Sequence, residues 1–440
     1  MINNMTKTDT IFSLFDFCGK QVDKVETYGS EALDENGDVI PFISQAAYVT
    51  HYLQLTRSGM QVPFAEKAEA LLRLWNDFAI GNKVLNETMG NMASEPYQVQ
   101  QQYLFPDMFK TPFQPPKKPQ FTFIDLFAGI GGFRIPMQWE NGLCVFSSEF
   151  NSHAQKVYYE NYGEVPFGDI TKIPLNCIPQ HDVLAAGFPC QPFSISGKMR
   201  GFEDTRGTLI YNVFKIIEAK QPKVVFLENV KHLVYHDGGN TLKTILGGLN
   251  GLGYKTSWQV LNASDFGVAQ NRERIIIIGN KEKEFDFSCL EKKPRVMLKE
   301  ILEEDKGQFE YLKEPYTLLS EYTKQPSGLI FVGYKNKAIR KAGVRPGTEH
   351  LSRVHKQPNR IYSSEGVHPA LPSQETSGRF WIFDKGNVRK LTIGECYRLM
   401  GFPEEFIRDK NIGEEYRQIG NSVCIPMIHE IIKQIKKQML

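Results

Sequence analysis

Cys190 lies in a segment that sets it apart from the other cysteines of the chain, Gly-Phe-Pro-Cys-Gln-Pro-Phe-Ser at residues 187–194. The segment follows an apolar run at 182–186, so the thiol is expected on the loop at the carboxyl end of a buried strand. Pro189 and Pro192 stiffen this loop. A rigid, exposed thiol is a poor choice for packing, which favours a reactive cysteine over the more common buried structural one.

Two further segments place polar side chains beside expected strands. Glu228 ends an apolar run, in Phe-Leu-Glu-Asn-Val, and is expected on the same sheet edge as Cys190, where an acid could donate a proton or a hydrogen bond to a heterocycle. In Gln-Asn-Arg-Glu-Arg at 270–274, alternation directs Arg272 and Arg274 to one side, where they could hold a base carbonyl and a phosphate. A solvated acid and a surface ion-pair cluster are the structural alternatives for these two segments.

A glycine-rich turn, Phe-Ala-Gly-Ile-Gly-Gly-Phe at 127–133, follows an expected strand and opens an expected helix. Its glycines permit a tight turn and the close approach of a ligand to the backbone. The third glycine of the dinucleotide-binding pattern would fall at Arg134, so a dinucleotide oxidoreductase is disfavoured. Glu149, 20 residues after Gly129, ends the next expected strand, where an acid can accept hydrogen bonds from ribose hydroxyls. Together these features favour a nucleoside cofactor, although the turn alone is also compatible with a purely structural role.

Short apolar runs that alternate with helical patterns must position these groups. The expected strands are residues 121–127, 144–148, 182–186, 224–227 and 275–278, and the expected helices between them are 208–219 and 241–252. This alternation predicts an α/β fold with a parallel sheet and helices on both faces. The carboxyl edge of such a sheet is where ligands bind, so the candidate residues are expected to share one edge.

At 440 residues the chain is long enough for two or three structural units. A segment with four prolines at 111–119 is the clearest boundary. The expected units are a mainly helical N-terminal extension of unknown role at 1–110, a proline-rich linker at 111–119, a catalytic domain at 120–293, a smaller irregular domain at 294–384, and a return to the catalytic domain at 385–440. For the extension, which has helical apolar spacing at 62–89, structural support or contact with the catalytic domain is preferred.

Charge and cysteine usage exclude several classes of protein. Residues 1–118 carry 10 Lys+Arg against 14 Asp+Glu, whereas the remainder carries 42 against 36. Nine of these basic residues lie between 330 and 380 against three Glu, which predicts a surface for a polyanion, with a solvated charged face as the alternative. The seven cysteines form no CxxC pair or cluster with His, which argues against a disulfide framework and a zinc site. Without a signal-peptide core or an apolar stretch of about 18 residues, the protein is expected to be cytoplasmic and to have no membrane partner.

The order and spacing of eight motifs resemble those of the bacterial cytosine-C5 DNA methyltransferases of restriction-modification systems, over about residues 121–440. The motifs are Phe-Ala-Gly-Ile-Gly-Gly-Phe at 127–133, the strand end at 144–149, Gly-Asp-Ile at 168–170, the cysteine loop at 187–194, Glu-Asn-Val at 228–230, Gln-Asn-Arg-Glu-Arg at 270–274, Arg-Lys-Leu-Thr at 389–392 with Arg-Leu-Met-Gly-Phe-Pro at 398–403, and Gly-Asn-Ser-Val at 420–423. The resemblance implies a Rossmann-like methyltransferase domain that uses S-adenosylmethionine.

The resemblance also implies a role for each matched residue. Cys190 would add to C6 of a cytosine and so turn C5 into a nucleophile that accepts the methyl group, after which a base removes the C5 proton and the cysteine leaves. Glu228 would hydrogen-bond the N3 and N4 side of the base, Arg274 would hold its O2, and Arg272 would support the loop and the substrate. The positions expected around the cofactor are Phe127, Gly129, Ile130, Gly131, Glu149, Asp169, Ile170, Leu209, Asn421 and Ser422.

Because C5 of a paired cytosine is stacked in the duplex, the resemblance implies base flipping. Residues 196–206 resemble the family's mobile loop that closes over DNA, and 294–384 correspond to the domain that reads the major groove, through contacts that the sequence does not specify. The residues expected to contact DNA are Ser194, Lys198, Arg200, Arg206, Lys335, Lys337, Arg340 and Arg360. The expected partners are double-stranded DNA and a cognate restriction endonuclease that forms no stable complex with a monomeric enzyme.

Two other functions remain open at this stage. An RNA cytosine methyltransferase would share the chemistry, but the long basic insertion favours a reader of duplex DNA. A DNA-binding regulator derived from an inactive methyltransferase is disfavoured because Cys190, Glu228 and Arg274 are all present.

Overall fold

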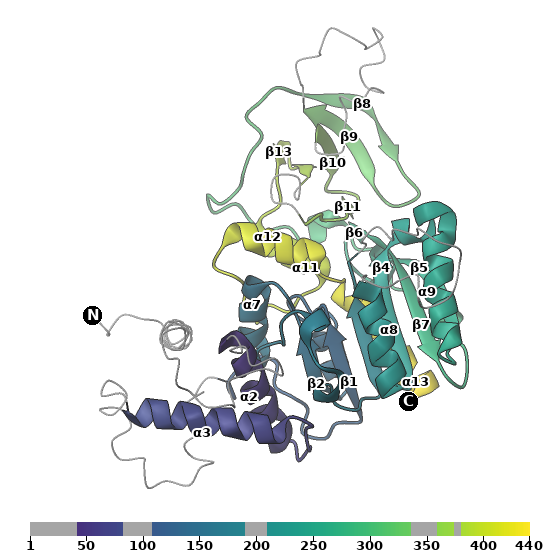
Figure 1. The fold of residues 1–440 in the computed structure, drawn as a ribbon. Coiled ribbons are helices and arrows are strands. Elements are labelled where there is room, and N and C mark those ends of the chain that lie inside the picture. Colours follow the sequence, from purple (N-terminus) through teal and green to yellow (C-terminus); the bar gives the residue numbers. More distant parts are fainter. Residues whose placement is uncertain (1–41, 82–107, 190–208, 336–358, 374–379) are drawn as a thin grey trace.

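The structure is a computed structural model that describes residues 42–81, 108–189, 209–335, 359–373 and 380–440. Cys190 and the loop that follows it lie outside these ranges. Figure 1 shows a large sheet covered by helices and a smaller sheet beyond α11 (Ile393–Met400) and α12 (Ile412–Asn421). Within the described ranges no helix is long and apolar enough to cross a membrane.

The larger sheet has six strands in the order β2-β1-β3-β4-β7-β5. The strands are β1 (Phe121–Leu126), β2 (Gly142–Ser148), β3 (Val183–Gly187), β4 (Val224–Val230), β5 (Lys255–Asn262) and β7 (Glu273–Asn280). The first four are parallel and almost wholly buried, as continuous apolar runs between two helical layers should be. The predicted α/β class is confirmed.

The prediction of a fully parallel sheet is wrong at one edge. β7 runs antiparallel to both of its neighbours, β4 and β5. The connection from β5 to β7, residues 263–272, is shorter than the dozen or so residues that a parallel crossover needs, so the chain must return in the opposite direction. β5 itself was not predicted, because it is an edge strand with a mostly polar and exposed sequence.

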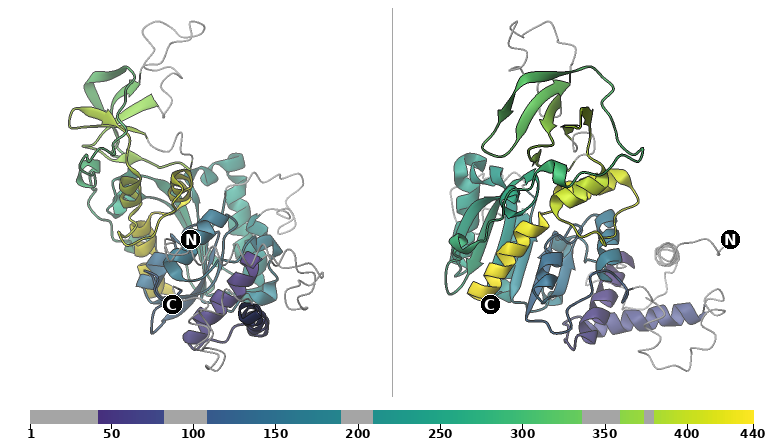
Figure 2. Two further views of the ribbon diagram at one scale, coloured as in Figure 1. Left: turned by 90° about the vertical axis from the view of Figure 1, so that its left-hand side faces the viewer. Right: turned by 180° about the vertical axis from the view of Figure 1, so that it is seen from behind.

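Helices cover both faces of this sheet. Side chains of α8 (Leu209–Lys220) and α9 (Asn240–Gly251) join one hydrophobic cluster with the sheet, and side chains of α6 (Arg134–Trp139) and α13 (Ile425–Met439) join another. Figure 2, seen from behind, shows α13 lying along the face opposite α8 and α9. The C-terminal helix thus packs on the sheet that begins about 300 residues earlier, at β1.

The N-terminal helices, α2 (Phe42–Arg57) and α3 (Ala65–Gly81), lie outside the edge formed by β2 and α7 (Ser152–Tyr162) (Figure 1). Tyr48 of α2 and Phe64, just before α3, both meet the ring of Phe167, with centroid distances of 4.9 and 5.7 Å. The described part of the extension therefore shares the hydrophobic core of the large sheet rather than forming a separate one.

The smaller sheet has the order β13-β12-β10-β9-β8. Its strands are β8 (Tyr316–Lys324), β9 (Ile330–Lys335), β10 (Arg360–Ser363), β12 (Trp381–Asp384) and β13 (Asn387–Arg389). β13 lies beyond the boundary predicted at residue 384 and still pairs with β12. A two-residue pairing of β6 (Gln270–Asn271) with β11 (His368–Pro369) connects the two parts.

Candidate functional site

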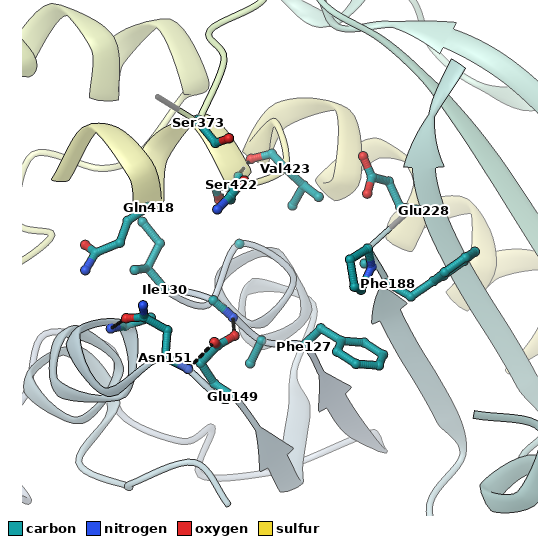
Figure 3. Close-up of a pocket in the computed structure, with 18 of the residues that line it drawn as sticks. Phe127, Ile130, Glu149, Asn151, Phe188, Glu228, Ser373, Gln418, Ser422 and Val423 are labelled. Carbon is teal, nitrogen blue, oxygen red and sulfur yellow. Dashed lines mark hydrogen bonds between the residues drawn. The ribbon is translucent and has the colours of Figure 1, made fainter. Parts of the chain in front are cut away.

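A cavity of about 770 Å³ lies at the carboxyl edge of the large sheet, within the size range of about 300–1,000 Å³ usual for small-molecule sites. Figure 3 shows Asn151 and Gln418 toward one end of it and Phe188 and Glu228 toward the other. Of the residues that the sequence predicted for the cofactor or the base, those that line this cavity are Phe127, Gly129, Ile130, Glu149, Asp169, Ile170, Leu209, Glu228, Arg272, Arg274, Asn421 and Ser422.

The glycine-rich turn has three residues with left-handed backbone, Phe127 (φ 55°), Gly129 (φ 54°) and Gly131 (φ 85°). Phe127 is strained there, because a side chain with a Cβ rarely adopts this conformation. Gly129 lines the cavity and has no atom within 4 Å of an added Cβ, so the space beside it is open. Gly131 differs from the prediction: it does not line the cavity, and an added Cβ would lie 2.2 Å from the hydroxyl of Tyr162. Helix packing therefore requires this glycine.

Glu149 directly follows β2, and its carboxylate connects the glycine-rich turn to the start of α7 through two hydrogen bonds. Its Oε2 accepts the N–H of Gly129 at 2.8 Å and its Oε1 accepts the N–H of Asn151 at 2.7 Å. Burial raises the pKa of this carboxyl group, although these backbone N–H groups favour the charged form. A carboxylate has about four lone-pair positions, so Glu149 can still accept hydroxyl groups from a ligand in the cavity.

Phe150 is a lining residue that the sequence analysis missed. Its side chain is 81% exposed, and it directly follows Glu149. An exposed aromatic ring at a cavity wall offers a flat face to a heterocycle. Its position after a strand-end acid was the available signal. The other lining residues that were missed include Asn151, Phe188, Ser373, Gln418 and Val423.

Glu228 and Arg274 meet on adjacent strands, β4 and β7. The Nε of Arg274 lies 3.0 Å from Oε1 of Glu228, and its Nη1 donates to the carbonyl of Glu273 at 2.9 Å. Burial raises the pKa of Glu228 above that of an ordinary glutamate, and the positive charges of Arg274 and Arg272 only partly oppose this shift. The acid is therefore suited to hold a proton near a bound ligand.

The cysteine loop begins beside Glu228. The side-chain amide of Asn229 donates to the carbonyl of Phe188 at 2.8 Å, and both Phe188 and Pro189 line the cavity. The start of the loop is thus tied to the end of β4. Cys190, the next residue in sequence, lies outside the described residues.

Arg272 was predicted to support the loop and the substrate, with a direct hold on a base carbonyl or a phosphate as another possibility; here its guanidinium binds main-chain carbonyls. It is 1% exposed, and its guanidinium donates to the carbonyls of Leu371 at 2.9 Å and of Gly420 and Ser422 at 2.7 Å each. Burial and the nearby Arg274 lower the pKa of Arg272 to about 9. These main-chain contacts join the C-terminal segment and residue 371 to the large sheet, so Arg272 shapes the wall of the cavity.

Most of the predicted DNA contacts fall outside the described residues: Ser194, Lys198, Arg200, Arg206, Lys337 and Arg340. The two described ones, Lys335 and Arg360, lie in the smaller sheet. Lys335 pairs with Glu314 and lies 5.8 Å from the ring centre of Trp381. The guanidinium of Arg360 lies 5.8 Å from the ring centre of Phe331. In this structure both cations thus make contacts within the smaller sheet.

The cavity fits S-adenosylmethionine in its chemistry as well as its size. A ribose would need hydrogen-bond acceptors, which the carboxylate of Glu149 has, and an adenine would need a flat apolar face, which the exposed ring of Phe150 has. The open space beside Gly129 leaves the backbone accessible to a ligand. The pair of Glu228 and Arg274 in the same cavity provides polar groups for a second ring system.

Comparisons with known proteins identify the family of the chain. The family model for C-5 cytosine-specific DNA methylases matches residues 121–437. The Type II methyltransferase M.MspI of a Moraxella species is 40% identical over 324 residues, which cover 72% of this chain and 70% of that protein. M.HhaI of Haemophilus parahaemolyticus is 38% identical over 330 residues, covering 71% of this chain and 93% of that protein.

The structural comparison concerns the fold alone. The crystal structure of the S. pombe Dnmt2 methyltransferase has a TM-score of 0.53 and 17% sequence identity, and the match covers 73% of this chain and all of that one. Members of the family that the model describes take their methyl group from S-adenosylmethionine. The chain belongs to the C-5 cytosine-specific DNA methylases and is an S-adenosylmethionine-dependent DNA (cytosine-5-)-methyltransferase.

Proposed function

We propose that this cavity holds the cofactor and the target cytosine side by side, with the ribose at Glu149 and the cytosine at Glu228. One observation carries this proposal: the acid that follows β2, Glu149, and the buried acid near the end of β4, Glu228, line a single cavity, the first hydrogen-bonded to the glycine-rich turn and the second paired with Arg274. When bound, S-adenosylmethionine supplies an electrophilic methyl group.

The chain's own residues activate the base. The thiolate of Cys190 adds to C6 of the cytosine, and the electron pair of the C5–C6 bond becomes available at C5 for bonding to the methyl carbon. Glu228, whose pKa is raised by burial, donates a proton or a hydrogen bond to N3 and so favours this addition. Loss of the C5 proton to a base then expels Cys190 and restores the aromatic ring.

Arg274 orients the base and Arg272 positions the cavity wall. A guanidinium has five N–H donors in a fixed plane, so Arg274 can pair with Glu228 and still offer a donor to O2 of the base. Arg272 acts through the carbonyls of Gly420 and Ser422, two residues that line the part of the cavity assigned to the cofactor. In this proposal only Arg274 of the two touches the substrate.

The cytosine must leave the duplex to enter this cavity, because its C5 is otherwise stacked. We assign the reading of neighbouring bases to residues 294–384, which contain most of the smaller sheet, and the closing of the site over DNA to residues 196–206. The relatives M.MspI and M.HhaI are named Type II methyltransferases. We therefore infer that this enzyme protects DNA in a restriction-modification system. It acts as a monomer in the cytoplasm without a stable complex with an endonuclease.

Bisulfite sequencing of DNA from a host that expresses the chain tests the activity and reveals the target. The expected result is one short sequence whose cytosine resists conversion at every copy, with loss of this protection in a Cys190→Ala control. Purified protein should also methylate plasmid DNA and not tRNA. Unprotected DNA together with methylated tRNA would show that the substrate is RNA.

A further inference from the structure

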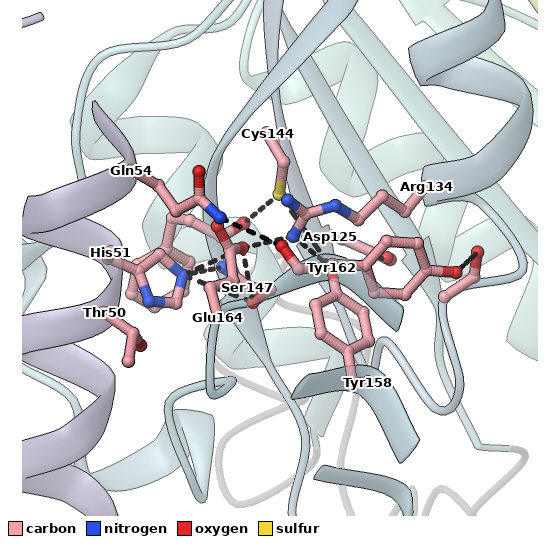
Figure 4. Close-up of polar contacts among 12 residues, drawn as sticks. Thr50, His51, Gln54, Asp125, Arg134, Cys144, Ser147, Tyr158, Tyr162 and Glu164 are labelled. Carbon is pink, nitrogen blue, oxygen red and sulfur yellow. Dashed lines mark hydrogen bonds and ion pairs between the residues drawn. The ribbon is translucent and has the colours of Figure 1, made fainter. Parts of the chain in front are cut away.

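Helix α2 of the N-terminal extension presents three buried polar side chains to the catalytic domain, Thr50, His51 and Gln54. Their exposed fractions are 0%, 0% and 2%. Burying such groups is unfavourable unless each one is hydrogen-bonded. Figure 4 shows them beside a polar network that includes Glu164 and Arg134.

His51 stabilises the outer edge of β2. β1 is the neighbour of β2 in the large sheet. On its other side β2 meets Phe167, which forms an isolated bridge with Ser148, and the N–H of Ser147 donates to Nε2 of His51 at 3.2 Å. The Nδ1 of His51 lies 2.9 Å from the carbonyl of Ala47, so the ring proton is on Nδ1 and Nε2 is the acceptor. Phe167 then exchanges hydrogen bonds with Ser147 and Glu149, at 2.8 Å each. α2 thus contacts the outer edge of β2 at Ser147, two residues before Glu149, the acid assigned to the ribose.

Thr50 and Gln54 fix the segment that follows α7. The Oγ1 of Thr50 accepts the N–H of Val165 at 3.0 Å. The amide of Gln54 donates to the carbonyl of Tyr162, the last residue of α7, at 3.0 Å. This segment continues to residues 168–170, which line the cavity.

A buried ion pair extends this contact to the glycine-rich turn. Glu164 pairs with Arg134, which directly follows the turn at 127–133 and begins α6. Burial would raise the pKa of Glu164, but Arg134 holds it below its usual value, so the carboxylate stays charged. The hydroxyl of Ser147 donates to Glu164 at 3.3 Å, and Nε2 of His51 lies at the same distance.

We propose that α2 is a positioning element for the methyl-donor site. Thr50, His51 and Gln54 hold the edge of β2 and the segment after α7, so that Glu149 and Asp169 are in place before the cofactor binds. None of the α2 residues whose side chains the structure describes, 45–57, lines the cavity, so this helix acts through the main chain that it holds. The inference rests on the proposed assignment of the cavity to S-adenosylmethionine. Because preorganisation lowers the cost of ordering a site on binding, loss of these contacts weakens cofactor binding.

A matched pair of Thr→Val substitutions on the same helix tests this proposal. Thr50→Val keeps the shape of the side chain and removes the acceptor for Val165. Thr56→Val is the control, because Thr56 is exposed and its hydroxyl donates to the carbonyl of Tyr52 within the helix at 2.7 Å. Calorimetry with S-adenosylmethionine should show a Kd about fivefold higher for Thr50→Val and an unchanged Kd for Thr56→Val.

Two further measurements separate positioning from a general loss of folding. At saturating cofactor, Thr50→Val should keep its kcat and its KM for DNA within about twofold, and hydrogen exchange should accelerate at residues 162–170. An unchanged Kd for a folded Thr50→Val would overturn the proposal. If Thr50→Val does not fold, Gln54→Leu takes its place with the same expected and contradicting results. A wild-type protein that does not bind the cofactor would instead refute the assignment of the cavity.

Discussion

Replacing Arg272 with Met tests whether this residue supports the cavity wall or contacts the substrate. The guanidinium is 1% exposed and makes three hydrogen bonds to main-chain carbonyls, of Leu371, Gly420 and Ser422, at 2.7 to 2.9 Å. Met retains an unbranched apolar side chain that can fill much of the space. The substitution therefore mainly removes the three charged-donor hydrogen bonds.

The size of the effect follows from opposing contributions. A hydrogen bond to a charged group contributes about 1.5–3 kcal/mol, so three of them contribute on the order of 4.5–9 kcal/mol before offsets. Burial of the cation and repulsion by Arg274 oppose this, as the lowered pKa of Arg272 indicates. We expect Arg272→Met to lower the free energy of unfolding by about 3–5 kcal/mol, the range for breaking a buried charged contact.

Urea unfolding of the wild type and two variants measures this difference. Arg295→Met is the control, because Arg295 is partly exposed, donates to the carbonyl of Pro326 at 2.9 Å and lies 3.8 Å from Asp265. It should change the free energy of unfolding by less than about 1 kcal/mol. An Arg272→Met protein that unfolds like the wild type but no longer methylates DNA would refute the supporting role. It would indicate instead that Arg272 contacts the substrate.

Four other expectations follow from the site. Cys190→Ala should abolish methyl transfer and covalent trapping on 5-fluorocytosine DNA but leave cofactor binding intact in calorimetry; trapping by this variant would contradict the nucleophile assignment. Glu149→Ala should weaken S-adenosylmethionine binding by about 5- to 150-fold, equivalent to roughly 1–3 kcal/mol, and should affect DNA binding less. An unchanged affinity for the cofactor would exclude the ribose role. Because burial raises the pKa of Glu228, its proton is retained to higher pH than on an ordinary glutamate, so kcat/KM should fall as pH rises through that pKa. Glu228→Gln should lower kcat by about 10²–10⁴ and remove this fall from the pH profile. A variant whose pH profile is identical to that of the wild type would argue against proton donation. Exchange of residues 294–384 for those of a relative with a known target should transfer that target in bisulfite sequencing, whereas an active chimera with the parental target would place recognition elsewhere.

The sequence alone determined the features that depend on local composition and on motif order. The strands β1 to β4 were predicted because each is a short apolar run bounded by turns, and the structure has each of them within a few residues. The turn at 127–133 was predicted from its glycines, and Gly129 and Gly131 do have left-handed backbone. The family was predicted from the motifs and is confirmed by the family model and the relatives.

Tertiary contacts decided what each predicted residue touches. Arg272 was expected to support the loop and the substrate, but the sequence did not show that it binds carbonyls about 100 to 150 residues away. Gly131 was expected beside the cofactor and instead makes room for Tyr162. The direction of β7 depends on where the chain returns to the sheet, which its Ile-rich sequence does not encode. The contact of His51 with Ser147 joins residues 96 positions apart. Such partners are not visible in a single sequence, because side-chain periodicity reports which face of an element is buried and not which distant segment covers it.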